Sequence, residues 1–214
     1  MRFDVITIFP DAVTSYLQTS LLGKAQKQGF IEVRVTDLRD FTSDVHRTVD
    51  DTPYGGGPGM VLKAEPIYRA VTQLRKDSDS KKIRVILFST RGQTFDRVMT
   101  RRLCTYDHLI LICGRYEGVD ERIATHLADE EISIGAYVLS GGELPALVVV
   151  EAVSRHVPGV LGKVESLEEI KGSYPVYTKP DAFVTDDGKT WEVPEVLRSG
   201  DHKKIDAWRK QYSL

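Results

Sequence analysis

Two glycine-containing segments of this chain, residues 114–122 and 132–143, combine residue types and spacing that could carry chemistry. Each follows or contains an apolar run of strand length and then turns on glycine. In an α/β protein, loops of this kind form a ligand crevice at the carboxyl ends of the strands. Together with the loop after Phe88, they could enclose an adenosine-like ligand, mainly through backbone groups. The sequence therefore predicts a small-molecule pocket at this edge of a sheet.

A third segment, Asp50–Met60, has four glycines within five positions. Such a loop lets backbone amides approach a phosphate or a flat base closely. It lacks the lysine and hydroxyl of a nucleotide-triphosphate loop, and its spacing fails the dinucleotide fingerprint at Met60. It is either a flexible surface turn or a substrate loop. Arg47 and the two neighbouring aspartates would suit contacts with the phosphate and amino edges of a nucleotide.

Other chemistries are disfavoured by what the sequence lacks. No acidic residue follows a dinucleotide glycine motif at about twenty positions, which argues against a nicotinamide cofactor. The five histidines are scattered and no two lie at ligand spacing, so no metal site is expected. Cys104 and Cys113 are too few for a disulfide framework, and we expect no catalytic role for either.

Strand and helix patterns alternate along the first three quarters of the chain. This alternation favours an α/β fold with a mostly parallel sheet covered on both faces. The apolar run at 144–153 is too short to cross a bilayer, and no secretion signal opens the chain, so we expect a cytoplasmic protein. The expected strands cover residues 3–9, 31–38, 83–88 and 108–113, and the expected helices cover residues 11–27, 66–74 and 95–103.

The composition changes after Gly162, which predicts three parts. These are a domain at 1–162, a linker or lid at 163–173, and a small domain at 174–214 that closes with a helix at 201–211. The net charge of -2 hides an asymmetry, because residues 198–214 hold five cations and two carboxylates and are therefore +3. That segment is either a patch for a polyanion or a solvated helix face.

Several separate sequence blocks occur in an order that resembles one known family. They are His46–Met60, Leu109–Arg122, Glu131–Glu143, Pro158–Gly162, Tyr177–Pro180 and Val193–Arg209. Together they resemble the bacterial tRNA (guanine-N1)-methyltransferase family TrmD of the SPOUT superfamily. The resemblance implies a deep trefoil knot that binds S-adenosyl-L-methionine, a flexible linker, and a small, mainly helical carboxyl-terminal domain that binds tRNA.

The resemblance also implies a homodimer whose two chains share each active site, and it leaves Mg²⁺ open as a further cofactor. The methyl group would go to N1 of the guanosine just 3′ of the anticodon. Arg155 matches an arginine that stabilises charge on the guanine; a salt bridge to Glu117 or Glu151 is the alternative role. Expected cofactor contacts are Leu87, Ser89, Thr90, Gly114, Tyr116, Glu117, Ile134, Gly135, Ala136, Tyr137, Val138, Leu139, Gly141 and Gly142. Expected substrate contacts are Arg47, Asp50, Tyr54, Gly55, Gly56, Gly57, Pro58 and Gly59.

The sequence departs from the family pattern in three places. The linker aspartate taken as the general base is absent, since residues 170–172 occupy its position. Glu169, one residue earlier, or Glu168 is expected to replace it, because a carboxylate on a longer stem has similar basicity; alternatively, both are solvated linker charges. Ala136 stands where the family usually has an aspartate. The chain also stops soon after Trp208 without a basic extension, which predicts either weaker tRNA binding or a shortened chain.

Two classes of function therefore remain at the level of sequence. The favoured one is a methyltransferase in which a carboxylate removes the N1 proton and Arg155 stabilises the charge that develops on O6. The alternative is a catalytically impaired relative that binds RNA or cofactor, or a methylase of a different RNA base. Transfer of labelled methyl to tRNA would discriminate between them.

Overall fold

The computed structural model describes residues 1–162 and 172–213 of the chain. The chain divides into two compact units, Met1–Leu161 and Gly162–Leu214, and each is described by itself. None of the described helices is long and apolar enough to cross a membrane.

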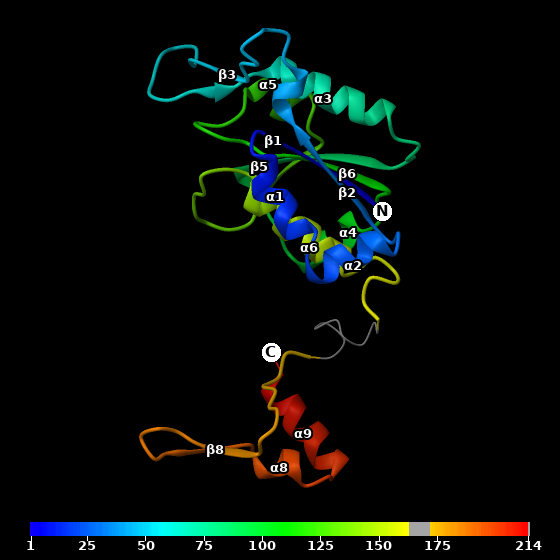
Figure 1. The fold of residues 1–214 in the computed structure, drawn as a ribbon, viewed down its shortest axis with the longest axis vertical. Helices are drawn as coiled ribbons and strands as arrows, with labels where there is room; N and C mark the ends of the chain where they lie inside the picture. The colour runs from blue at the N-terminus through cyan, green and yellow to red at the C-terminus, as the bar shows by residue number, and fades with distance from the viewer. Residues whose placement is uncertain (163–171, 214) are drawn as a thin grey trace. The chain divides into compact units, whose positions relative to one another are not determined.

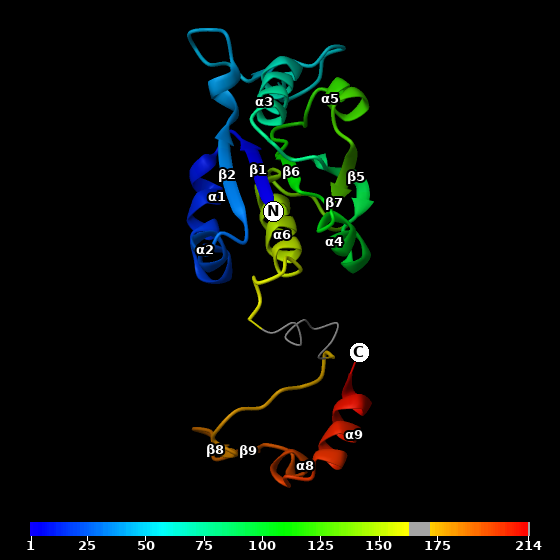
Figure 2. The ribbon, with the colours of Figure 1, turned by 90° about the vertical axis from the view of Figure 1, so that its right-hand side faces the viewer.

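The first unit is built on a five-stranded sheet in which every pair of neighbouring strands is parallel. Its order is β2-β1-β6-β5-β7, so all five carboxyl ends meet at one edge (Figure 2). This arrangement confirms the predicted α/β fold with a mostly parallel sheet. The strands are β1 (Arg2–Thr7), β2 (Glu32–Asp37), β5 (Ile83–Thr94), β6 (His108–Ile112) and β7 (Glu130–Ser133).

Helices cover both faces of this sheet, with α3 and α5 on one side and α1, α2, α4 and α6 on the other (Figure 1). The central strand β6 is buried along its whole length because Leu109 and Leu111 face one layer while Ile110 and Ile112 face the other. A parallel sheet buried on both faces explains its continuous apolar run. The helices are α1 (Pro10–Leu17), α2 (Ser20–Lys27), α3 (Ala64–Lys76), α4 (Arg97–Leu103), α5 (Glu121–His126) and α6 (Glu143–Ser154).

The single helix expected at 11–27 is wrong, since α1 and α2 are separated by a turn at Gln18 and Thr19. In one straight helix, Val13 and Leu22 would lie about 180° apart around the axis. Both side chains are buried in the same core cluster, so the chain must change direction between them. Gly23 allows the close turn, because a Cβ there would lie 2.2 Å from the carbonyl oxygen of Gln18.

Strand β5 is longer than the expected 83–88, because it resumes after an irregularity. Phe88 and Gln93 both pair with Ile132 of β7, so residues 89–92 bulge out between them. Gly92 lies against β7 so closely that a Cβ would be 2.6 Å from the backbone nitrogen of Ile132. The glycine-ended loop predicted at 89–92 therefore exists as a bulge within a strand.

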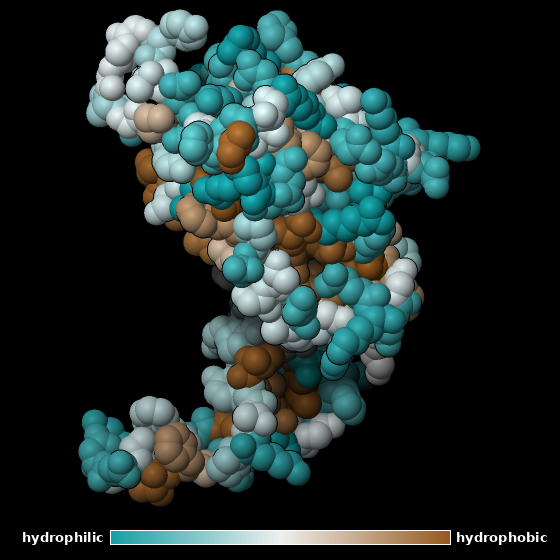
Figure 3. All heavy atoms as spheres, turned by 45° about the horizontal axis from the view of Figure 1, so that its top comes forward, coloured by the Kyte–Doolittle hydropathy of each residue, from teal (hydrophilic) through white to brown (hydrophobic). Residues whose placement is uncertain are grey.

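The second unit contains a β-hairpin followed by two helices, whereas the sequence predicted a mainly helical domain. Its closing helix is displaced by one residue from the predicted 201–211, and Asp201 caps it by accepting hydrogen bonds from the backbone of Lys203 and Lys204. Ile205 is the one buried hydrophobic side chain in the described part of this unit. Figure 3 shows apolar side chains exposed on the hairpin, where Phe183, Val184 and Trp191 lie. The elements are β8 (Ala182–Val184), β9 (Thr190–Glu192), α8 (Glu195–Arg198) and α9 (His202–Tyr212).

Candidate functional site

Three loops at the carboxyl edge of the sheet enclose a cavity of about 550 Å³. They follow Phe88 of β5, the end of β6 and the end of β7, which are the positions where the sequence predicted glycine-turned loops. A volume of this size lies within the range that small-molecule and cofactor sites occupy.

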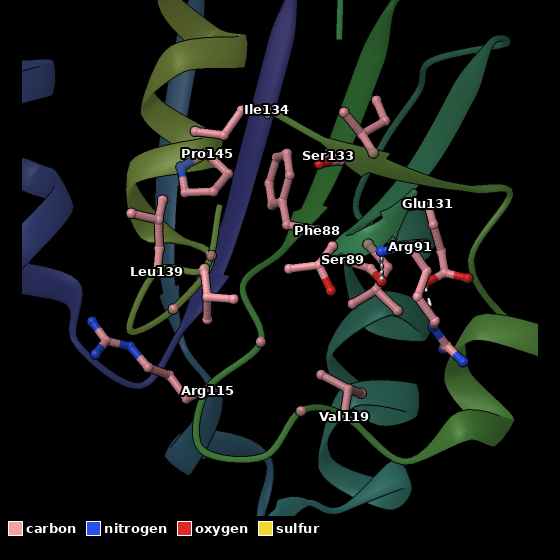
Figure 4. A pocket seen from close by; sticks show the side chains of 18 of the residues that line it. Phe88, Ser89, Arg91, Arg115, Val119, Glu131, Ser133, Ile134, Leu139 and Pro145 are labelled. Carbon is pink, nitrogen blue, oxygen red and sulfur yellow. Dashed lines mark hydrogen bonds and ion pairs between the residues drawn. The ribbon is translucent and has the colours of Figure 1, made fainter. Parts of the chain in front are cut away.

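The side chains around this cavity form two contrasting walls (Figure 4). Ile134, Leu139 and Pro145 make an apolar wall on one side. Ser89 and Glu131, with Arg91 and Thr90 beside them, make a polar wall on the other. A slot of this kind suits a ligand with a flat apolar part and an adjoining hydroxyl-bearing part.

Backbone atoms bring the loops after β6 and β7 into direct contact. The amide of Gly142 donates a 2.9 Å hydrogen bond to the carbonyl of Gly114, and Arg115 and Gly141 form an isolated antiparallel bridge. A Cβ at Gly142 would lie 2.6 Å from the Cα of Cys113. Residue 142 must therefore be glycine, because a side chain would not fit between the two loops. Their close contact closes one corner of the cavity.

A buried carboxylate beneath this corner links three elements. Glu143, in the first turn of α6, accepts a 2.6 Å hydrogen bond from the Thr7 hydroxyl and a 2.9 Å bond from Nε of Arg115. The guanidinium of Arg115 also lies 4.5 Å from the centre of the Phe9 ring. Nearby, burial raises the pKa of the Cys113 thiol well above its ordinary value, so a reactive thiolate is disfavoured there.

Nearly all the predicted cofactor residues meet at this cavity, and Ala136 alone lies outside its lining. Ala136 is exposed on the loop between Gly135 and Tyr137. The Tyr137 hydroxyl donates a 3.1 Å hydrogen bond to the carbonyl of Ile134, which folds this loop back on itself. The predicted residues that line the cavity are Leu87, Ser89, Thr90, Gly114, Tyr116, Glu117, Ile134, Gly135, Tyr137, Val138, Leu139, Gly141 and Gly142.

Sequence reasoning missed several side chains of the cavity and its support. Arg91 and Glu131 lie on the polar wall, and Glu143 with Thr7 supports the glycine corner. Thr7 and Glu143 are 136 positions apart, so no local pattern links them. Glu143 is the last residue of the segment 132–143 that the sequence singled out. That it is buried, with 3% of its surface exposed, could not be read from the sequence.

Six of the predicted substrate residues, Tyr54 to Gly59, lie on a different loop, while Asp50 is in the strand before it and Arg47 precedes that strand. The loop joins β3 (Asp50–Asp51) to β4 (Val61–Leu62), and Tyr54 at its tip is fully exposed. At its far end, the amide of Glu117 donates a 3.0 Å hydrogen bond to the carbonyl of Met60. The loop thus ends against a residue that lines the cavity. Arg47 forms an ion pair with Asp40 outside the cavity, while Gly55, Gly56, Gly57 and Pro58 are exposed and Gly59 lies against the Glu117 side chain.

Of the two predicted catalytic residues, Arg155 lies within the described part of the chain and is not among the residues that line the cavity. Arg155 follows the last turn of α6, whose twelve residues place it about 18 Å from the end that meets the cavity. No ion pair joins it to Glu117 or Glu151 in the described part of the chain. Glu169 and Glu168 lie outside the described residues. Within the described ranges, no group of three or more metal-binding side chains is present.

Comparison with known proteins identifies the family to which this chain belongs. The family described as tRNA (Guanine-1)-methyltransferase TrmD matches residues 1–214, the full length of the chain. The chain belongs to this family. It is 48% identical over 219 aligned positions to the tRNA (guanine-N(1)-)-methyltransferase of Moorella thermoacetica, covering all of this chain and 86% of the relative. It is 50% identical to the enzyme of the same name from Dictyoglomus turgidum, covering all of this chain and 85% of the relative.

The fold agrees with this membership. The crystal structure of tRNA (m1G37) methyltransferase from Aquifex aeolicus superposes with a TM-score of 0.82 at 41% sequence identity, covering 99% of this chain and 88% of the other. The family resemblance stated from the sequence blocks is therefore confirmed, and so is its implication that the chain is a TrmD-type methyltransferase. The trefoil knot stays a prediction.

Proposed function

We propose that this protein transfers the methyl group of S-adenosyl-L-methionine to N1 of the guanosine 3′ of the anticodon in tRNA, the position that the name of the Aquifex aeolicus relative gives as 37. The observation that carries the proposal is the cavity between three glycine-turned loops in a chain that belongs to the TrmD family.

The residues present fit this methyl donor. An adenine ring matches the apolar wall of Ile134, Leu139 and Pro145. The polar wall lies where a sugar joined to that ring would follow. Gly135, with φ of +156°, keeps the loop in a path that other residues rarely adopt.

A homodimer is supported by the exposed apolar surface of α1 and α6, which pack against each other. Tyr16 on α1 and Leu144 and Val148 on α6 expose between 42% and 59% of their surface, and Phe9 beside them exposes 44%. Apolar side chains that gather in this way are typical of protein interfaces. Because Arg155 lies at the far end of α6 from its own cavity, a second copy would have to supply this residue.

The chemistry assigns separate roles to two side chains. Guanine N1 carries a proton, so a carboxylate must remove it for the nitrogen lone pair to attack, a service worth on the order of 100 to 10,000-fold. We assign this base to Glu169. Arg155 would stabilise the negative charge that gathers on O6, which is most effective in a site closed to water. When bound, the cofactor supplies an electrophilic methyl on a sulfonium; the carbon–sulfur bond breaks as the carbon–nitrogen bond forms, leaving S-adenosylhomocysteine.

The distinguishing experiment measures transfer of labelled methyl to tRNA with guanosine after the anticodon, beside the same tRNA with adenosine at that position. We expect transfer to the first tRNA only. Binding of tRNA or cofactor without transfer would favour the alternative of a catalytically impaired relative, and transfer to both tRNAs would favour a methylase of another base. Parallel reactions with EDTA and with added Mg²⁺ test the metal requirement. As an enzyme of tRNA, it is expected to act in the cytoplasm.

A further inference from the structure

An aspartate, a histidine and a serine meet at the amino edge of the five-stranded sheet, where the start of β1 is marked N in Figure 2. Asp4 lies on β1 and His108 on the neighbouring β6, and both side chains are fully buried. Because side chains alternate between the two faces of a strand, both point into the layer of Ile6 and Ile110, which α3 covers. Ser78 lies two residues beyond the end of α3. The cluster is therefore at the opposite edge of the sheet from the cavity between the glycine-turned loops.

The three side chains form a linear array of hydrogen bonds. Nε2 of His108 pairs with Oδ2 of Asp4, and Nδ1 of His108 lies 3.0 Å from Oγ of Ser78. An ionised carboxylate only accepts, so Nε2 donates to Asp4, and Nδ1 of the neutral ring is left as an acceptor that faces the serine hydroxyl. In chymotrypsin-type enzymes Nε2 faces the serine, but either nitrogen of a neutral imidazole can accept a proton. Hydroxyl, imidazole and carboxylate in this order activate a serine for attack on acyl groups.

Arg2 holds this array in place. Its Nε donates a 2.7 Å hydrogen bond to Oδ2 of Asp4, and its Nη1 donates a 3.0 Å bond to the carbonyl of the residue before Ser78. The backbone amide of Ser80 donates a 3.3 Å bond to Oγ of Ser78, which leaves the hydroxyl proton for Nδ1. Because Arg2 balances the charge of Asp4, His108 can be buried here without a positive charge of its own. The ring is therefore available as a base.

Ser78 also lines a hollow of about 930 Å³, which shares no lining residue with the cavity between the glycine-turned loops. The serine is half-buried, whereas the histidine behind it is fully buried. The wall of the hollow is polar and carries both signs of charge, and Lys81 in this wall offers a positive charge for an oxyanion. A small polar acyl compound can therefore approach the serine from this side.

We propose that Ser78 is a nucleophile that takes the acyl group of activated esters and thioesters, with His108 as its general base. In this step, Oγ forms a bond to the acyl carbon and gives its proton to Nδ1. The bond from that carbon to the phenol or thiol breaks, and the phenolate or thiolate leaves with the electron pair. This chemistry does not depend on the proposed methyl transfer.

The burial of His108 determines the kinetics of this reaction. Hydrolysis of the acyl group requires a water molecule at Nδ1, but the ring has no exposed surface. Acylation should therefore be faster than hydrolysis. The protein should release about one equivalent of phenol per chain in a burst and then continue slowly, the kinetic signature of an accumulating acyl-enzyme.

The test mixes the full-length protein with p-nitrophenyl acetate, follows the release of p-nitrophenol, and locates the acetyl group by mass spectrometry. Trypsin yields a peptide of residues 77–81 that contains Ser78 and Ser80, so fragmentation compares the two serines directly. Wild type should acetylate Ser78 on the order of 100-fold or more faster than Ser80, which is the contribution of a general base. Ser78→Ala should lose the burst, and the matched control Ser80→Ala should keep it.

His108→Gln separates catalysis from a structural role. A glutamine amide can donate to Asp4 and accept from Ser78, but it is not basic. This variant should therefore keep the circular dichroism spectrum of wild type and lose the burst. Ser78→Ala changes only the half-buried end of the array, so it decides the question even where His108→Gln does not fold.

Three outcomes would overturn the proposal. Release of p-nitrophenol by wild type without a burst, or equal acetylation of Ser78 and Ser80, would show that the serine is not activated. A burst that persists in Ser78→Ala would place the reactive group on another residue. A burst that persists in folded His108→Gln would show that the imidazole is not the base and that the array only holds α3 to the sheet.

Discussion

Gly142→Ala tests whether contact between two loops shapes the cavity. Gly142 has φ of -82° and ψ of -3°, which alanine adopts without strain, so any effect comes from space rather than from backbone conformation. The new methyl carbon would lie 2.6 Å from the Cα of Cys113 and 3.0 Å from the amide nitrogen of Gly114. Both are backbone atoms, so the loop after β6 must move away from the start of α6.

The cost of this movement follows from overpacking in proteins, which destabilises by about 1–3 kcal/mol. For a unit of this length, that lowers the melting temperature by about 2 to 12 °C. The assay combines thermal unfolding by circular dichroism with calorimetric titration of S-adenosylhomocysteine, and we expect both stability and affinity to fall. Gly162→Ala is the control, because a Cβ there meets nothing within 4 Å. If Gly142→Ala melts and binds like wild type, the glycine corner does not determine the cavity.

Three further predictions concern the active-site arginine, the second unit and an ion cluster. Arg155→Ala should nearly abolish methyl transfer while cofactor affinity persists; retained turnover would remove its proposed role. Ile205→Ala should cost the second unit about 2–5 kcal/mol, so the fluorescence of the chain's two tryptophans, both in that unit, should change at lower denaturant while circular dichroism of the first unit does not. Burial opposes ionisation of Glu130, but hydrogen bonds from Arg102 and Arg84 outweigh it and lower its pKa. This stabilisation is present above the ordinary carboxylate range and is lost as pH falls through the lowered pKa. Glu130→Gln should therefore reduce stability by about 1–3 kcal/mol at neutral pH and flatten the acid limb of the stability curve, and an unchanged limb would contradict this.

The cavity could be predicted from the sequence because each strand and the glycine turn that follows it are consecutive in the chain. An apolar run such as 108–113 followed at once by glycine predicts both a buried strand and the turn that ends it. In a parallel sheet, all such turns meet at one edge, so loops far apart in sequence could be assigned to one site. Recognition of the family blocks then supplied the candidate cofactor residues, and all of them except Ala136 line the cavity.

Other features depend on contacts that no local pattern records. The apolar residues of 11–27 look helical in short windows, yet Val13 and Leu22 can share a core only if the helix breaks. Asp4, Ser78 and His108 are far apart in the sequence, and only the fold brings their side chains together. The hairpin of β8 and β9 lies in a turn-rich segment, where three-residue strands leave too little periodicity to detect.

The closed corner between Gly114 and Gly142 also affects how readily resistance to an inhibitor of this cavity could arise. At this corner, a compound in the cavity would meet mainly the main chain of Gly114, Gly141 and Gly142, whose hydrogen-bonding groups are the same whatever residue is encoded. Substitutions that exclude the compound by adding bulk at the corner would force the two loops apart and lose the native ligand too. Drug resistance should therefore arise less readily from this corner than from the side-chain wall around Ser89 and Glu131.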